Sequence, residues 1–195
     1  MRTRDYPGDR NGLRTLIVPG LLGSGPQHWQ SLWQEEHPEY ERVVQKDWCV
    51  ANLDIWARSI VRQIKVFSGP VILAAHSFGC LAVVRATELA PALIRGALLV
   101  APANPARFGV ESLVSRLRLG YPSILVASRN DPWMPYSDAA CWARRWGSRL
   151  VDAGNAGHIN AEAGYGDWFE GEQLLDELRA EVWHGQSGNV VSLAA

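Results

Sequence analysis

Short apolar runs alternate with longer amphipathic segments along most of the chain. The runs that predict strands are Thr15–Val18, Arg42–Trp48, Val71–Ala75, Gly96–Val100, Ser123–Ser128 and Arg149–Asp152. The segments that predict helices are Pro26–Glu36, Leu53–Phe67, Phe78–Leu89, Ser137–Trp146 and Glu170–Trp183. Single helices between successive strands favour right-handed crossovers and a parallel sheet covered on both faces. We therefore expect an α/β fold with a mostly parallel sheet of about six strands.

The clearest helical pattern follows Asn52, a residue that commonly caps helix N-termini. From Leu53 to Phe67 apolar residues recur at helical spacing. The length of 195 residues suits one domain with a sizeable core, and no repeat or linker interrupts the alternation. We predict a single domain over residues 1–195, in which residues 1–12 and 185–195 form flexible tails.

The most informative segment surrounds Ser77. The apolar run Val71–Ala75 leads into Ala75-His76-Ser77-Phe78-Gly79, and a helical pattern follows at once. A serine on a sharp strand-to-helix turn, between small residues, is typical of the nucleophile elbow Gly-x-Ser-x-Gly. Alanine replaces the first glycine of that motif at Ala75. The alternative is an ordinary turn whose serine only caps the helix.

Two downstream loops contain the residues that an activated serine needs. Asp131 and His158 each follow a predicted strand, and the order Ser, Asp, His is that of α/β-hydrolases. Loops after parallel strands lie at one edge of the sheet, so the three side chains can meet there. Serine needs a base, imidazole can supply it, and a carboxylate orients the imidazole. Singly, Asp131 could start a turn before Pro132, and His158 could be an ordinary loop histidine.

An oxyanion hole requires backbone N–H groups near the nucleophile. Phe78, the residue after the serine, would supply one donor. The loop after the first strand would supply the other, from Leu21 or, as second choice, Leu22. The glycines of this loop match neither the dinucleotide fingerprint nor the lysine-bearing phosphate loop, so a nucleotide site is not expected.

Taken together, the motifs resemble a known family. They are Val18-Pro19-Gly20 with Gly23-Ser24-Gly25 and His28-Trp29, the sequence around Ser77, Asn130-Asp131-Pro132, and Gly157-His158-Ile159-Asn160. The chain looks like the retinoblastoma-binding-protein-9-like serine hydrolases, compact α/β-hydrolases, from about Leu13 to Trp183. The resemblance implies a fold without a large lid, a Ser77–Asp131–His158 triad and hydrolysis of esters or related acyl compounds.

The segment Pro102–Tyr121 occupies the place where many α/β-hydrolases carry a lid. It is long enough for one short amphipathic helix, which predicts an open, shallow site. A rival possibility is that Phe108, Leu113 and Leu117 form a miniature cap. Candidate residues of the substrate pocket are Leu22, Trp133 and His28, although His28 could instead begin a helix. His76 is rejected as the base because its side chain should point away from that of Ser77.

Composition narrows the function classes. A net charge of −1 gives no basic field for nucleic acid, and no apolar run approaches a membrane span. Three cysteines without metal-ligand spacing are expected to be reduced and mostly buried, as in a cytoplasmic protein.

We expect no cofactor and no metal, and a small ester or acyl compound as the partner. The sequence does not specify a protein partner. The first hypothesis is a serine hydrolase that cleaves small to medium carboxylic esters, or thioesters or amides, through an acyl-enzyme. The alternative is a binding protein of the same fold with little turnover, which would have no need of an ordered triad.

Overall fold

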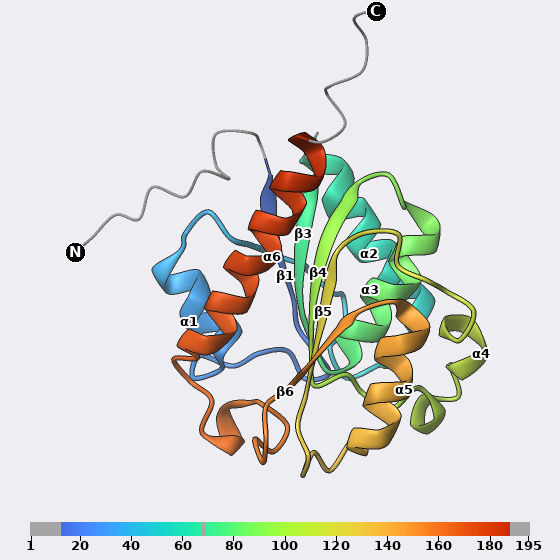
Figure 1. The fold of residues 1–195 in the computed structure, drawn as a ribbon, viewed down its shortest axis with the longest axis vertical. Helices are drawn as coiled ribbons and strands as arrows, with labels where there is room; N and C mark the ends of the chain where they lie inside the picture. The colour runs from blue at the N-terminus through green and yellow to red at the C-terminus, as the bar shows by residue number, and fades with distance from the viewer. Residues whose placement is uncertain (1–12, 68, 188–195) are drawn as a thin grey trace, which may run out of the picture.

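The computed structural model describes residues 13–67 and 69–187 and contains one six-stranded sheet (Figure 1). The strands are β1 (Arg14–Val18), β2 (Glu41–Arg42), β3 (Val71–His76), β4 (Ile94–Val100), β5 (Ser123–Ala127) and β6 (Arg149–Asp152). Their order across the sheet is β2-β1-β3-β4-β5-β6, and every neighbouring pair is parallel. The expected parallel α/β fold is thus confirmed.

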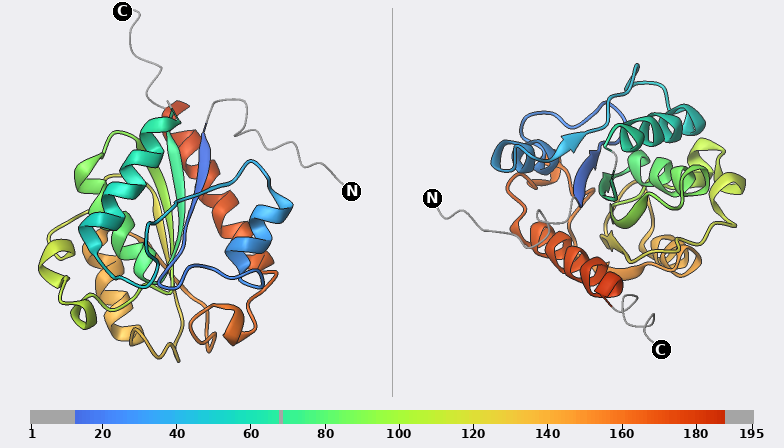
Figure 2. Two further views of the ribbon diagram at one scale, coloured as in Figure 1. Left: turned by 180° about the vertical axis from the view of Figure 1, so that it is seen from behind. Right: turned by 90° about the horizontal axis from the view of Figure 1, so that it is seen from above.

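Helices cover both faces of this sheet (Figure 2). They are α1 (Trp29–Glu36), α2 (Leu53–Val66), α3 (Phe78–Leu89), α4 (Glu111–Val114), α5 (Tyr136–Trp146) and α6 (Phe169–Ser187), with 3-10 turns η2 (Pro105–Phe108) and η3 (Ala161–Ala163). Helices α1 and α6 lie on one face, and α2, α3 and α5 lie on the other. Leu73 and Ala75 pack toward α2 and α3, whereas Ile72 and Ala74 pack toward α1 and α6. The alternation follows from the two-residue period of a strand.

The topology reverses between β1 and β3. The chain leaves β1 through α1 to reach β2, which is one edge strand of the sheet. It leaves β3 through α3 in the opposite direction, toward β4 and the other edge strand, β6. In an open parallel sheet, a crevice for ligands forms where the connections diverge, outside the carboxyl ends of the strands. The loops after β1 and β3 begin at these carboxyl ends, which lie at the lower edge of the sheet in Figure 1.

Several local predictions were wrong. The predicted strand Arg42–Trp48 is reduced to the two residues of β2 at the edge of the sheet. Residues 185–187, predicted as part of a tail, belong to α6, and the rest of that prediction (1–12 and 188–195) lies outside the described residues. Cys49 and Cys141 are exposed and Cys80 alone is buried, although most cysteines were expected inside.

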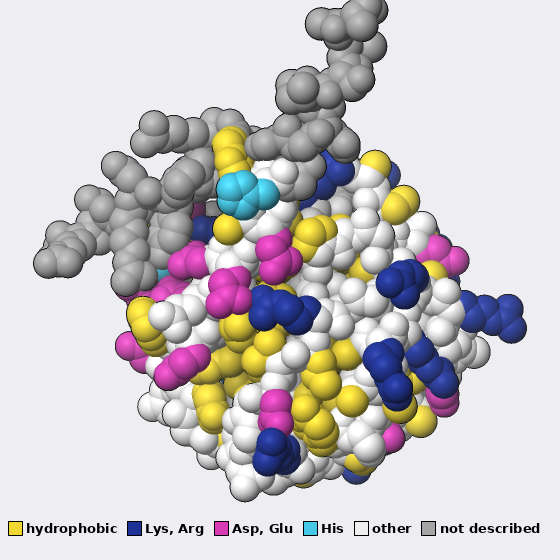
Figure 3. Space-filling view, in the orientation of Figure 1, with side chains coloured by type: hydrophobic (Ala, Val, Ile, Leu, Met, Phe, Trp, Pro, Cys, Tyr) yellow, Lys and Arg dark blue, Asp and Glu magenta, His cyan; other side chains and the backbone are white. Residues whose placement is uncertain are grey.

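The surface mixes both signs of charge. In the view of Figure 3, acidic side chains gather mostly on the side of α6, and basic side chains on the side of α4 and α5. Arg149, on β6, forms ion pairs with Glu177 and Glu181 of α6. Within the described part of the chain, no helix combines the length and the apolar character that crossing a bilayer requires.

Helix α3 begins unusually close to β1. A Cβ atom added at Gly79 would lie 2.5 Å from the carbonyl oxygens of both Val18 and Pro19. Real Cβ atoms do not approach backbone oxygen so closely, so only glycine allows this packing. Gly79 therefore sets how near the turn at Ser77 can come to the loop after β1.

We expect Gly79→Ala to lower the free energy of unfolding by about 1–3 kcal/mol, the usual effect of forcing a methyl group into a packed interior. Urea unfolding followed by far-ultraviolet circular dichroism measures the change. Gly25→Ala is the matched control, because a Cβ atom there meets nothing within 4 Å. Equal unfolding midpoints for the two variants would contradict the proposed close packing.

Candidate active site

Ser77 occupies the turn between β3 and α3 in a backbone conformation that few residues adopt. Its φ of 54° and ψ of −124° lie outside the regions favoured by side-chain-bearing residues. The turn is held by hydrogen bonds from the Ser77 N–H to the Val100 carbonyl and from the Cys80 N–H to the Ser77 carbonyl. Ala75 lies buried in β3 and has no positive φ, so this position does not require glycine.

The structure brings Ser77, Asp131 and His158 together as the sequence predicts. The Ser77 hydroxyl lies 3.0 Å from His158 Nε2 and is placed to donate to it. His158 Nδ1 lies 3.0 and 2.9 Å from the two oxygens of Asp131 and can donate to them. The side chains of His158 and Asp131 are 9% and 2% exposed. A serine, an imidazole and a carboxylate therefore form one hydrogen-bonded chain.

The loops that carry Asp131 and His158 are tied to each other. The Asn130 side-chain oxygen accepts from the Gly157 N–H at 2.7 Å. The Ser128 hydroxyl donates to the same Asn130 oxygen and accepts from the Ala156 N–H at 2.9 Å. Because these bonds join the ends of β5 and β6, the carboxylate and the imidazole hold their relative positions without the substrate.

His158 also sits in a strained and anchored stretch of backbone. Its neighbours Gly157 and Ile159 have φ values of 57° and 46°. The indole N–H of Trp29 donates to the Ile159 carbonyl at 3.0 Å, and His76 Nε2 donates to the His158 carbonyl at 2.9 Å. Backbone strain persists only where surrounding contacts hold it, and here two buried side chains do so.

The loop after β1 presents backbone amides beside the nucleophile. A Cβ atom added at Gly20 would lie 2.8 Å from the Cβ of Ser77, so these two segments of the chain are in direct contact. The Leu22 N–H donates to the Trp48 carbonyl at 2.9 Å. Among the described residues the Leu21 N–H has no such acceptor, and Phe78, as the first residue of α3, has none within its helix. The amides of Leu21 and Phe78 therefore have no backbone acceptor within the described protein.

Three histidine rings line up beneath the site. His28 and His76 have ring centroids 4.8 Å apart, and so do His76 and His158. His28 caps α1 by accepting a hydrogen bond from the Gln30 N–H, which is the helix-start role that the sequence offered as the alternative. The ring of His76 lies between the rings of His28 and His158. Burial lowers the pKa of His28 to about 4, helped by Arg42 and His158, and burial also keeps the pKa of His76 well below its usual range.

The outer rim of the site is aromatic and contains one cation that the sequence did not single out. Trp133 is 47% exposed, and its ring centroid lies 6.1 Å from that of His158. The Arg107 guanidinium lies over the Trp133 ring, 5.4 Å from its centroid. Phe108, the next residue, packs against Phe78. Leu22, 78% exposed, belongs to the loop beside the nucleophile, and whether it touches substrate stays a prediction.

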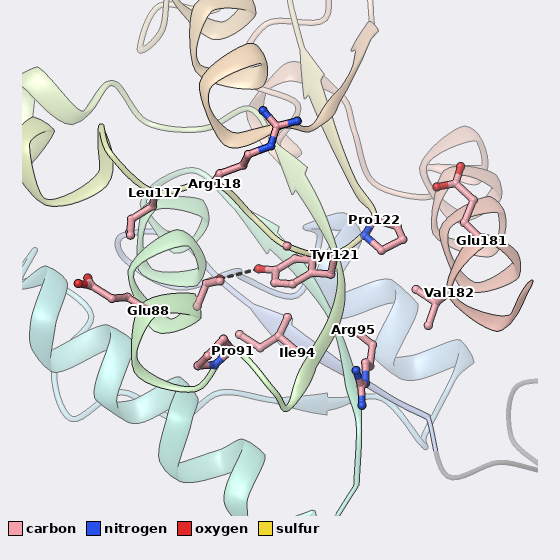
Figure 4. Close-up of a pocket in the computed structure, with 12 residues that line it drawn as sticks. Glu88, Pro91, Ile94, Arg95, Leu117, Arg118, Tyr121, Pro122, Glu181 and Val182 are labelled. Carbon is pink, nitrogen blue, oxygen red and sulfur yellow. Dashed lines mark hydrogen bonds between the residues drawn. The ribbon is translucent and has the colours of Figure 1, made fainter. Parts of the chain in front are cut away.

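No lid covers the described site. The connection between β4 and β5 forms only η2 and the single turn α4, the short helical structure expected for it. Of the three residues considered for a miniature cap, Phe108 contacts Phe78 beside the nucleophile, but Leu117 lines a different hollow (Figure 4). That hollow, about 710 Å³, lies between the C-terminal end of α3, the start of β4, the segment before β5 and α6, and Ser77, Asp131 and His158 do not line it.

Two other reactive groups can be separated from this site. Burial raises the pKa of the Cys80 thiol, which donates to the Val100 carbonyl, so Cys80 is a packing residue rather than a nucleophile. Among the described residues one cluster has metal-ligating atoms close together, formed by Glu36, His37 and Glu172. Its histidine is hydrogen-bonded to Glu172, which makes it a bridge between α1 and α6.

The parallel sheet, the turn at Ser77 and the loops that follow β5 and β6 define an α/β-hydrolase fold. The sequence matches the family described as Serine hydrolase over residues 15–177, so the chain belongs to the serine hydrolase family. No match to a curated protein was found.

Solved structures agree with this family. A YdeN-like hydrolase from Pectobacterium atrosepticum is 42% identical, with a TM-score of 0.86 over 90% of this chain and 94% of its own. The ydeN gene product of B. subtilis is 17% identical, with a TM-score of 0.70 over 88% and 98% of the two chains. Est1E from Butyrivibrio proteoclasticus, solved with ferulic acid, is 17% identical, with a TM-score of 0.60 over 94% of each chain. The last two comparisons show the fold alone.

The low pKa of His28 predicts how stability depends on pH. The pKa of folded His28 is about 4, below the unfolded value of about 6.5. The unfolded state therefore binds more protons in this window, and the free energy of unfolding should fall as pH drops from 6.5 to 4. His28→Asn retains an oxygen for the Gln30 N–H but cannot be protonated, so it should reduce this fall by up to about 3 kcal/mol.

Urea unfolding of wild type and variant at several pH values between 4 and 7 tests this expectation. His184→Asn is the matched control, because it removes a histidine that is exposed on α6 instead of a buried one. If wild type and His28→Asn lose stability equally across the window, His28 is not held neutral by the fold.

Proposed function

We propose that the protein hydrolyses carboxylic esters through an acyl-enzyme on Ser77. The observation that carries the proposal is the continuous hydrogen-bonded chain from Ser77 through His158 to Asp131. In the first step the Ser77 oxygen bonds to the substrate carbonyl carbon while His158 Nε2 takes the hydroxyl proton. The bond to the alcohol oxygen then breaks, and His158 returns the proton to that oxygen.

Water completes the cycle. Its oxygen attacks the acyl carbon, His158 takes one of its protons, and the bond to the Ser77 oxygen breaks as the proton returns to it. Asp131 keeps the proton of neutral His158 on Nδ1, which leaves Nε2 free to act as the base, and it stabilises the imidazolium between steps.

The negative oxygen of each tetrahedral intermediate needs donors that are in place before the reaction. We assign this role to the N–H groups of Phe78 and Leu21. The Leu22 N–H, the second choice from sequence, is engaged by the Trp48 carbonyl, which favours Leu21. Because Gly20 touches Ser77, the Leu21 amide lies next to the nucleophile.

The expected substrates are small to medium esters, with thioesters and amides open to the same chemistry. The reason is the short connection from β4 to β5, which leaves no lid to enclose a long acyl chain. Each buried methylene contributes about 0.8 kcal/mol, so an open site gains little from longer chains. We also place the chain in the retinoblastoma-binding-protein-9-like branch of the family, on the motifs around Gly20, Ser77, Asp131 and His158.

Ser77→Ala should lower kcat for a 4-nitrophenyl ester on the order of a million-fold, because removal of the nucleophile disables the whole triad. The measurement is release of 4-nitrophenol by protein whose circular dichroism matches wild type. Ser112→Ala, at an exposed position of α4, is the matched control and should retain full activity. Turnover by Ser77→Ala close to that of wild type would refute the proposal. An inactive but folded wild type would support the binding protein instead.

A further inference from the structure

Arg107 lies at the mouth of the site and its position is fixed by an aromatic ring. It belongs to η2, which begins five residues after the end of β4, and its guanidinium carbon is 5.4 Å from the centroid of the Trp133 ring. Trp133 in turn is 6.1 Å, centroid to centroid, from His158. The guanidinium carbon therefore lies no more than 11.5 Å from the imidazole centre, within the length of a small substrate.

The charge of Arg107 is not neutralised by the protein. Some arginines of the described chain have carboxylate partners, such as Arg85 with Asp54 and Arg129 with Asp152. Among the described residues Arg107 has no carboxylate within 4.0 Å, and its described contact is the Trp133 ring. A guanidinium that lies over a ring forms no hydrogen bond to it through that contact, so its N–H donors stay available to an anion.

The mechanism determines which half of an ester meets this cation. His158 must return its proton to the alcohol oxygen, so the alcohol half passes beside the imidazole. Trp133 borders the imidazole and Arg107 lies over Trp133. Groups on the alcohol half, rather than the acyl half, are therefore the ones that reach Arg107.

The buried carboxylate nearby does not cancel this attraction. Both oxygens of Asp131 lie within hydrogen-bond distance of His158 Nδ1, and one also accepts from the Trp133 N–H at 2.8 Å. The Asp131 side chain is 2% exposed, whereas Arg107 is exposed to solvent. An arriving anion meets the guanidinium first.

We propose that Arg107 binds an anionic group on the alcohol half of the substrate, held about one aromatic ring away from the ester oxygen. A carboxylate, sulfonate or phosphate on an aryl alcohol has this chemistry, and its ring can rest beside Trp133. The inference rests on the esterase activity proposed above and adds to it the class of substrate.

Two acetate esters that differ in charge test the proposal: 4-acetoxybenzoate, which is anionic, and the neutral 4-acetoxybenzamide. The measured quantity is the ratio of their kcat/KM values, which cancels changes that affect both substrates alike. Arg107→Gln should lower this ratio about fivefold, the effect of one lost charge pair near a protein surface, with most of the change in KM. Arg107→Lys should restore part of it.

Arg145→Gln is the matched control, because Arg145 also stacks on a tryptophan, Trp142, but on α5 and without a triad contact. Its ratio should equal that of wild type. Added sodium chloride should reduce the wild-type ratio and leave that of Arg107→Gln unchanged, since the attraction is screened.

The outcomes separate the two claims. Hydrolysis of the neutral ester by wild type, with a ratio that Arg107→Gln does not change, would overturn the role of Arg107 and leave the esterase intact. An equal loss on both substrates would show a structural role for Arg107 and would also overturn the proposal. If folded wild type hydrolyses neither ester, the esterase proposal fails, and this inference fails with it.

Discussion

The close contact between the start of α3 and the end of β1 is the constraint on which the site depends. Gly79 lies against the Val18 and Pro19 carbonyls with no room for a methyl group, and a Cβ atom added at Gly20 would lie 2.8 Å from that of Ser77. These two glycines bring the loop after β1 against the nucleophile turn. Because the turn leaves Ser77 at a positive φ, its hydroxyl projects from the sheet edge, where the amides of Leu21 and Phe78 have no backbone acceptor.

The rest of the site consists of groups that hold His158 in place. Asn130 and Ser128 bind the loop that contains His158 to the loop that contains Asp131. His76 donates a hydrogen bond to the His158 carbonyl, and Trp29 donates one to the carbonyl of Ile159. The bonds of Ser128, Trp29 and His76 are buried, whereas the Asn130–Gly157 bond is exposed. Such networks are costly if left incomplete, and when complete they keep one arrangement of the site. The proposed base is thus positioned before a substrate arrives, which is what general base catalysis requires.

The sequence was sufficient to predict the parallel sheet and the proximity of Ser77, Asp131 and His158, because each residue follows an apolar strand and parallel strands end at one edge. The sequence-based predictions were least accurate for features that depend on tertiary contacts. The strand predicted to begin at Arg42 shortens because an edge strand has one neighbour, and only β1 pairs with it. The choice between Leu21 and Leu22 depends on a hydrogen bond to Trp48, a residue far along the chain. No local pattern indicates such a partner.

The histidines and Arg107 illustrate the same limit. His28 could be placed at a helix start, but its ring contact with His76 depends on how α1 packs against β3. Arg107 looks like any surface arginine in sequence. Arg107 lies near the site because its guanidinium is over the ring of Trp133. Trp133 belongs to the loop after β5 and its ring lies next to that of His158. A signal that could have suggested it is the position of Arg107 just after β4, at the carboxyl edge where the other loops meet.

The central claim is that the fold activates Ser77 as a nucleophile. A fluorophosphonate probe tests this most directly, because it reacts with an activated serine and not with an ordinary hydroxyl. Mass spectrometry of the digested protein should find one adduct, on the peptide that contains Ser77. Labelling should disappear after unfolding in urea, since the folded sheet edge holds His158 and Asp131 in place. An unlabelled native protein, or an adduct on another residue with Ser77 unmodified, would contradict the account.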